Sequence, residues 1–317
     1  MPRKRTTFAI AGVFLTVFGV FVYSEYRRDI RAACARVSSR SKLVDTYCGQ
    51  IEYAETGSGP AVLVIHGAGG GFDQGLDLAQ PLIDAGFRVI AVSRFGYLRT
   101  PMPAVATPEA QADAHACLLE ALKVERAAVI GGSAGAPSAM QLCLRHPERC
   151  SALVLLFPMA FAPDRVQVKP SALFKFVIKA TLHSDFPFWV ATKVARGILM
   201  KTVLGTPVED FREAPAGEQE RTLDVMHHIL PVSQREKGIW SDATIGPVLP
   251  RYDLERLYVP TLLVSAEDDL YDTYPSARYT AAHIPSARFL GYPRGGHLLL
   301  GHWKDASSEV VAFLRGH

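Results

Sequence analysis

The sequence predicts an α/β protein with a mostly parallel β-sheet that is flanked by helices. The first observation is a set of short apolar runs, such as residues 61–65 and 127–130, which are typical of strands buried on both faces of a sheet. The second is that helical patterns separate these runs, as they do in βαβ units. The third is size: 317 residues, 49% of them hydrophobic, suffice for one large core with an insertion, or for two small domains.

The N-terminus predicts a membrane segment. Residues 1–5 are basic, and residues 6–23 carry no charge, which just reaches the length of a membrane-spanning helix. We therefore expect a single-pass anchor in residues 1–24 and a membrane localisation, with a cleaved secretory signal and a secreted or periplasmic body as the alternative. Arginines just beyond this stretch leave the side of the membrane open. The charged residues 25–47 are predicted to form a linker or an amphipathic helix.

The folded domain is predicted to begin near Cys48, and strands and helices then alternate along the chain. Thr107, Pro108 and Glu109 favour a helix start, because they supply a capping side chain, a proline in the first turn and an early acid. Pro101 opposes a helix in the loop before them. The predicted strands of this half span 50–55, 61–65, 87–92, 127–131 and 151–156, and the predicted helices span 72–85, 107–122 and a stretch that ends near 146.

This alternation breaks after Pro158. Residues 159–250 combine aromatic side chains, helical patterns and several prolines, so we interpret them as a helical insertion. The α/β rhythm then resumes, so residues 48–158 and 251–317 are expected to form one core. The remaining predicted strands span 258–264 and 287–291, and the remaining predicted helices span 273–283 and 298–315.

The stretch Gly131-Gly132-Ser133-Ala134-Gly135 lies between a predicted strand and a predicted helix. A Gly-x-Ser-x-Gly pattern in this context is typical of a nucleophile elbow, a sharp turn that holds a serine hydroxyl above the sheet. The backbone at such a serine is strained, and its flanking positions must be almost free of side-chain atoms, as Gly131 and Gly135 are. The following helix places its positive N-terminal end beside the serine. The pattern therefore predicts Ser133 as a nucleophile.

Four motifs, each after a predicted strand, resemble the α/β-hydrolase fold family, and the resemblance covers roughly residues 48–317. In this family the catalytic residues follow the chain order serine, acid, histidine. The resemblance implies Ser133 as the nucleophile, His297 as its base and Asp269 as the acid that orients the base. The motifs are His66-Gly67-Ala68-Gly69-Gly70, Gly131-Gly132-Ser133-Ala134-Gly135, Ser265-Ala266-Glu267-Asp268-Asp269 and Gly295-Gly296-His297.

The acid motif departs from the family pattern at one position. Ala266 stands where the family has a glycine, and Asp268, adjacent to Asp269, is the alternative acid. His302 competes with His297 as the base. It falls within the predicted last helix, so we expect it to pack or to form a hydrogen bond. The other aspartates of the cluster are expected to be surface turn residues.

Hydrolysis through an acyl-enzyme also requires two backbone N–H groups that stabilise the negative charge on the substrate oxygen. The amide of Ala134, directly after the nucleophile, is expected to supply one of them. The amide of Ala68 is expected to supply the other, with Gly69 as the alternative. His66 is expected to brace this glycine-rich loop rather than to take part in the reaction.

Together these features predict a serine hydrolase that cleaves a small acyl ester without a cofactor or a metal ion. The alternatives are hydrolysis of a carbon–carbon bond, perhydrolase chemistry, and a catalytically silent member of the fold that binds a ligand at the membrane. The resemblance also implies that the insertion at 159–250 is a cap over the active site, with apolar side chains that line an acyl pocket.

The sequence lacks the patterns that are typical of nucleic-acid, phosphate and metal sites. The formal net charge is +3, and the body of the chain has no basic stripe with interleaved aromatic residues, which argues against a nucleic-acid partner. The run Gly67–Gly71 lacks the ending of a phosphate-binding loop, and no H-E-x-x-H pattern occurs. The five cysteines form no C-x-x-C pair, so we expect mostly buried or free thiols. A Cys34–Cys48 disulfide is the alternative for an exported body.

Overall fold

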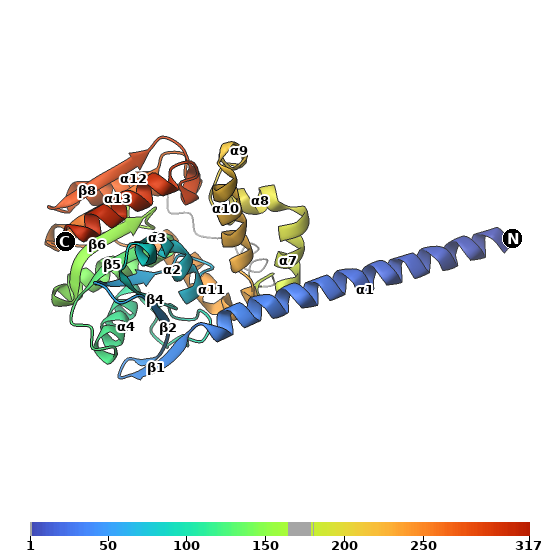
Figure 1. The fold of residues 1–317 in the computed structure, drawn as a ribbon, viewed down its shortest axis with the longest axis horizontal. Coiled ribbons are helices and arrows are strands. Elements are labelled where there is room, and N and C mark those ends of the chain that lie inside the picture. Colours follow the sequence, from blue (N-terminus) through green and yellow to red (C-terminus); the bar gives the residue numbers. More distant parts are fainter. Residues whose placement is uncertain (1, 164–178, 180) are drawn as a thin grey trace.

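A computed structural model of the chain describes residues 2–163, 179 and 181–317. Within these residues, one sheet of eight strands has the order β1-β2-β4-β3-β5-β6-β7-β8 (Figure 1). The contacts of β1 with β2 and of β2 with β4 are antiparallel, and all the others are parallel. The strands are β1 (Lys42–Thr46), β2 (Gly49–Thr56), β3 (Ala61–Ile65), β4 (Arg88–Val92), β5 (Ala127–Gly132), β6 (Cys150–Leu156), β7 (Thr261–Ala266) and β8 (Ala287–Tyr292). The predicted mostly parallel sheet is confirmed.

The central strand β3 shows why an unbroken apolar run forms the middle of this sheet. Leu63 and Ile65 pack into an apolar core on one face, and Val62 and Val64 pack into a second core on the opposite face. All four side chains are fully buried. Successive side chains of a strand point to opposite faces, so a strand covered on both sides must be apolar at every position.

Helices form the outer layers of these two cores. Helices α4, α5 and α12 contribute to the first core, and α2, α3 and α13 contribute to the second. The helices of the sheet domain are α2 (Phe72–Leu78), α3 (Gln80–Asp84), α4 (Pro108–Ala121), α5 (Ala136–Arg145), α12 (Thr273–His283) and α13 (Trp303–Arg315). Short 3₁₀ turns are η1 (Ser133–Gly135), η2 (Pro147–Arg149), η3 (Val232–Gln234), η4 (Gly246–Val248), η5 (Leu254–Arg256) and η6 (Gly296–Leu298).

The described residues between β6 and β7 are mainly helical, and we refer to them as the cap. Trp189, Met226, Ile229 and Leu230 are buried in a third apolar core that belongs mainly to this segment. Residues 164–178 and 180 of the predicted insertion lie outside the described residues. The helices of the cap are α7 (Asp185–Val194), α8 (Arg196–Thr202), α9 (Val208–Glu213), α10 (Ala216–His228) and α11 (Glu236–Ile245).

The predicted membrane anchor needs correction. The N-terminal segment forms the long helix α1 (Pro2–Ser39), whose N-terminal end projects away from the body of the protein (Figure 1). In the part of the chain that the structure describes, no helix is long and apolar enough to cross a membrane. This finding contradicts the anchor in residues 1–24 and the membrane localisation that it implied. In the C-terminal half of α1, Val22, Tyr26 and Ile30 pack against the apolar core of the cap.

The segment predicted as a linker or an amphipathic helix, residues 25–47, is part helix and part strand. It forms the C-terminal part of α1 and the edge strand β1. Asp29 of α1 accepts hydrogen bonds from Trp189 Nε1 at 3.0 Å and from Lys193 at 2.9 Å, both on α7. Charged residues after an apolar stretch suggested a solvated connection, but here some of those charges are partners for the cap.

Two disulfides replace the thiols that the sequence predicted. Cys48 is bonded to Cys117, and Cys143 is bonded to Cys150. Cys34 has a free thiol, so the alternative Cys34–Cys48 bridge is wrong. Cys48 and Cys117 are 69 residues apart in the sequence. They meet because the β1–β2 turn lies against α4, a tertiary contact that cysteine spacing alone does not encode.

Candidate active site

The turn at Ser133 has the sharp backbone geometry that the sequence predicts. Ser133 follows β5, begins η1 and has a φ of 48°, in the left-handed region that non-glycine residues rarely adopt. A Cβ atom on Gly135 would lie 2.4 Å from the carbonyl oxygen of Ile65, and one on Gly131 would lie 2.7 Å from Ala139 Cβ. Both contacts are too short for real atoms. The strand can therefore turn directly into α5 only because both flanking residues are glycines.

Asp269 and His297 are in direct contact. His297 Nδ1 lies 2.7 Å from Asp269 Oδ2, and both side chains are almost fully buried. Asp269 also accepts hydrogen bonds from the Thr273 hydroxyl and, at 2.8 Å, from the Tyr271 amide. Burial opposes ionisation of Asp269, but the charge of His297 and these hydrogen bonds outweigh it and hold the pKa of Asp269 below its ordinary value. The acid is therefore ionised beside the histidine.

Ser133, Asp269 and His297 follow the carboxyl ends of β5, β7 and β8, so they share one edge of the sheet. Phe157 directly follows the intervening strand β6 and lies close to both the histidine and the end of β5. Its ring centroid is 4.5 Å from that of His297, and its edge would be 3.8 Å from a Cβ on Gly132. The structure thus joins Asp269 to His297 directly and places Ser133 at the same end of the sheet.

Asp268 and His302, the alternatives for the acid and the base, make other contacts. Asp268 accepts hydrogen bonds from the amides of Gly296 at 2.8 Å and Gly295 at 3.2 Å, so it holds the backbone of the histidine loop. His302 precedes α13, and its ring stacks on Tyr292 with centroids 4.6 Å apart. Neither residue makes the contact with His297 that Asp269 makes.

The glycine-rich loop after β3 passes beside the nucleophile. A Cβ on Gly67 would lie 3.1 Å from Ser133 Cβ. The amides of Gly67 and Gly69 donate hydrogen bonds within the protein, to Gln74 at 2.9 Å and to the Tyr97 hydroxyl at 3.3 Å. Because the Gly69 amide is engaged, the exposed Ala68 is the better candidate of the two predicted donors in this loop.

His66 stabilises this loop through two hydrogen bonds. Its Nδ1 donates to the carbonyl oxygen of Gly67 at 2.6 Å, and its Nε2 accepts the amide hydrogen of Arg94 at 3.0 Å, which defines a neutral ring. Burial, followed by the charge of Arg94, lowers the pKa of His66 well below its ordinary value. With both nitrogens occupied, His66 has no free atom for proton transfer.

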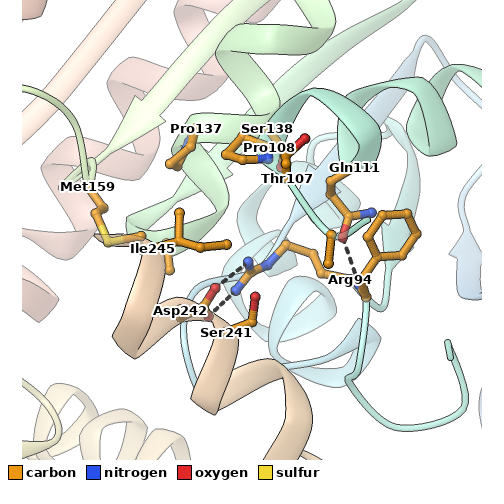
Figure 2. A pocket seen from close by; sticks show the side chains of 13 residues that line it. Arg94, Thr107, Pro108, Gln111, Pro137, Ser138, Met159, Ser241, Asp242 and Ile245 are labelled. Atoms are coloured by element: carbon orange, nitrogen blue, oxygen red, sulfur yellow. Dashed lines mark hydrogen bonds and ion pairs between the residues drawn. The ribbon is translucent and has the colours of Figure 1, made fainter. Parts of the chain in front are cut away.

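A cavity beside Ala134 lies between the sheet domain and the cap (Figure 2). On its cap side, Asp242 of α11 forms a two-point ion pair with Arg94, with distances of 2.8 and 2.6 Å. Asp242 also accepts a hydrogen bond from Tyr97 at 2.5 Å. Arg94 and Tyr97 contact the glycine-rich loop as well, through Gly67 and Gly69. The cap thus helps to position the loop that carries Ala68, a role for Asp242 that no sequence pattern indicated.

A second buried ion cluster holds the far end of the same loop. Asp73, at the start of α2, pairs with Arg36 of α1 and with Arg235, which follows η3. Arg235 is fully buried and also donates to the carbonyl oxygen of Gly70. Two arginines from distant parts of the chain therefore meet one carboxylate beside the candidate site, and the sequence analysis missed all three.

Among the described residues, no group of three or more histidine, cysteine, aspartate or glutamate side chains is placed to hold a metal ion. The candidate site consists instead of a serine at an elbow, a histidine–carboxylate pair and backbone amides. Fold and site together define the class of this protein: it is a hydrolase built on an α/β sheet with a helical cap.

Comparison of the chain with known proteins identifies its family. The family model described as alpha/beta hydrolase fold matches residues 60–205. The uncharacterized hydrolase YcgS of Bacillus subtilis is 34% identical over 284 residues, which cover 84% of this chain and 95% of YcgS. The chain belongs to the α/β-hydrolase fold family.

Two further similar proteins align with more than four fifths of this chain. A 2-hydroxy-6-oxo-6-phenylhexa-2,4-dienoate hydrolase of Burkholderia cepacia is 24% identical over 267 residues, 83% of this chain and 90% of that enzyme. The solved structure of an alpha/beta hydrolase fold protein from Nakamurella multipartita is 27% identical, with a TM-score of 0.67 over 87% of this chain and 99% of that one.

Proposed function

We propose that this chain hydrolyses a small molecule through Ser133, His297 and Asp269. Ser133 Oγ attacks a carbonyl carbon, His297 accepts the hydroxyl proton, and Asp269 stabilises the protonated histidine. The observation that carries the proposal is the buried contact of 2.7 Å between His297 Nδ1 and Asp269, at the sheet edge that also bears the strained Ser133. Because Nδ1 faces the acid, Nε2 is the nitrogen left for the serine proton.

The negative oxygen formed by this attack would be held by backbone amides. Ala134 follows the nucleophile directly at the N-terminal end of α5, and Ala68 lies in the loop that passes beside Ser133. A donor aimed at developing charge in a site of low dielectric contributes more than it would in water. His297 then returns its proton to the leaving group, and water releases the acyl group from Ser133 by the same steps in reverse order.

For the bond that is cleaved, we propose a carbon–carbon bond of a 2-hydroxy-6-oxo-dienoate. Support comes from the Burkholderia enzyme and from a 2-hydroxy-6-oxononadienedioate hydrolase of Comamonas testosteroni, each aligned over 83% of this chain. In such a reaction water adds across the bond between the ketone carbon and its neighbour. The ketone carbon becomes a carboxylic acid, and the departing carbon keeps the electron pair and takes a proton. Delocalisation of that electron pair requires the dienol first to convert to its keto form: the 2-hydroxyl proton moves to the departing carbon, and the pair left after cleavage is then conjugated with the 2-oxo group.

Ester hydrolysis is the second candidate, and the same histidine–carboxylate pair favours it. An alkoxide leaves more readily than a carbon atom and needs only a proton from His297. The substrate therefore decides between the two reactions, while the roles of Ser133 and Asp269 are the same in both.

A comparison of two substrates tests the choice of bond. We expect the purified protein to convert 2-hydroxy-6-oxo-6-phenylhexa-2,4-dienoate to benzoate, with a higher kcat/KM than for p-nitrophenyl butyrate. Absorbance of the dienoate and chromatography of the products measure this. If the protein hydrolyses the ester but does not convert the dienoate, the carbon–carbon proposal is wrong. If a fluorophosphonate does not label Ser133, the proposed role of Ser133 as the nucleophile is wrong. That result would favour a catalytically silent protein that binds a ligand.

Replacement of the acid tests the triad separately. We expect Asp269→Asn to lower kcat by about 10³- to 10⁴-fold, because an amide in this place no longer stabilises the protonated His297 or selects its reactive tautomer. Steady-state kinetics on the better of the two substrates measures the loss. The control is Asp253→Asn, an exposed aspartate, which should match the wild type. Equal losses in the two variants would remove Asp269 from the proposed triad.

A further inference from the structure

We propose that Asp268 and Asp210 form a carboxyl pair that shares one proton and fixes the cap onto the loop of His297. Both are then positioning residues for hydrolysis. The inference rests on the proposed role of His297 as the base. Asp268 lies in the turn after β7, directly before the proposed acid, and Asp210 lies on the cap helix α9.

Both carboxyl groups converge on the same backbone amide. The amide of Gly295 lies 3.2 Å from Asp268 Oδ2 and 3.3 Å from Asp210 Oδ2, and the amide of Gly296 donates to Asp268 Oδ1 at 2.8 Å. Gly295 and Gly296 directly precede His297. One N–H group offers a single proton to two acceptors, so two ionised carboxylates would repel each other at this point. A proton between the two carboxyl groups removes that repulsion.

The surroundings of Asp210 favour its protonated form. Burial, followed by the hydrogen bond and the charge of Asp268, raises the pKa of Asp210 above its ordinary value. Arg294, from the loop before His297, contacts Asp210 at 2.6 Å and opposes this shift. Arg294 is half-exposed and shares its charge with Glu213 of the same cap helix, at 3.1 Å. Among the described residues, Asp268 and Arg294 are the charged groups that act on Asp210, and Glu213, at the end of the same helix, contacts Arg294.

The pair acts on the proposed base through a short segment of the cap. The carbonyl oxygen of Gly205, just before α9, accepts the amide hydrogens of both His297 at 3.2 Å and Leu270 at 2.9 Å. Leu270 is the residue after Asp269. The Tyr271 hydroxyl donates to the carbonyl oxygens of Thr202 and Val203 in the same segment. Any loosening of this segment therefore disturbs the two loops whose side chains must stay 2.7 Å apart.

The pH dependence has a definite sign. A carboxyl group whose pKa is raised in the folded protein stabilises the fold while it is protonated, and this stabilisation is lost as pH rises through the raised value. Above the raised pKa of Asp210 the two carboxylates should repel, the cap should loosen, and His297 should be less well aligned. Asp210→Asn supplies an amide N–H that hydrogen-bonds to Asp268 without titrating, so it should lack this loss.

The test is the rate at which a fluorophosphonate labels Ser133, measured across pH. We expect Asp268→Ala to lower the rate by up to about 10²-fold, the loss that a misplacement of about 1 Å can cause. Asp210→Asn should label like the wild type in mildly acidic solution and faster than the wild type in alkaline solution. The exposed control Asp253→Asn should follow the wild type at every pH. Coinciding pH profiles of wild type and Asp210→Asn would overturn the proposal.

A second measurement separates this inference from the proposed function. If the wild type is not labelled at all, the role of Ser133 fails, and the midpoint of thermal unfolding then tests the pair. We expect the midpoint of the wild type to fall more steeply in alkaline solution than that of Asp210→Asn. This measurement also serves if Asp268→Ala does not fold. Parallel midpoint curves for wild type and Asp210→Asn would refute the shared proton.

Discussion

Ser133→Ala is expected to lower kcat by about 10⁶-fold, the loss found when a nucleophile is removed from a serine triad. The substitution deletes one oxygen atom and leaves the elbow otherwise unchanged. Alanine at a φ of 48° is as strained as serine, so the free energy of unfolding should stay close to that of the wild type. Steady-state kinetics, labelling by a fluorophosphonate and a thermal melt together measure the effect.

The matched control for this variant is Ser308→Ala, an exposed serine on α13 that is remote from the elbow. It should retain the activity and the labelling of the wild type. If Ser133→Ala kept more than about one hundredth of the wild-type kcat, another group would have to be the nucleophile, because water activated by His297 alone does not sustain such a rate.

Asp73→Ala is expected to lower the free energy of unfolding by about 3–5 kcal/mol, the usual cost of removing one partner from a buried ion pair. Asp73 is 6% exposed and faces both Arg36 and Arg235. Its removal leaves the fully buried Arg235 without a counter-charge. Denaturant unfolding measures the change, and the exposed Asp253→Ala, which loses only a surface pair, should differ from the wild type by less than about 1 kcal/mol.

The same residue predicts how stability depends on pH. Burial opposes ionisation of Asp73, but Arg235 and then Arg36 outweigh it and hold the pKa of Asp73 well below its ordinary value. A carboxylate with a lowered pKa stabilises the fold above its unfolded pKa, and this stabilisation is lost as pH falls through the folded pKa. The stabilities of wild type and Asp73→Ala should therefore converge in strong acid. A constant difference between them across acidic pH would contradict this account.

Local patterns in the sequence were enough to predict the centre of the fold. A strand buried on both faces must be apolar at every position, so an apolar run such as 61–65 can be recognised as a buried strand from the sequence alone. The elbow is also a local pattern in the sequence, although only Gly131 is required by contacts with the adjoining helix, whereas Gly135 is required by the close approach of Ile65 on β3. The motif order then predicted Asp269 and His297, whose side chains lie in contact in the structure.

The features that the sequence did not predict all depend on distant partners. Asp242 reaches Arg94 across 148 positions, and Arg36 reaches Asp73 from another helix. A single charged residue looks the same in a sequence whether it faces water or a buried partner. The edge strand β1 was missed for a related reason, since its short, half-exposed pattern becomes a strand only when β2 lies beside it.

The docking of α1 also limits how the protein can be shortened for expression. A version that began at residue 48 would lack both Arg36 and β1. Asp73 would keep one arginine, and β2, still paired with β4, would become the edge strand and expose backbone groups along which protein molecules tend to aggregate. A shortened version that starts at or before Val22 would retain the part of α1 that packs against the cap. It would remove only the end of the helix that projects from the body (Figure 1).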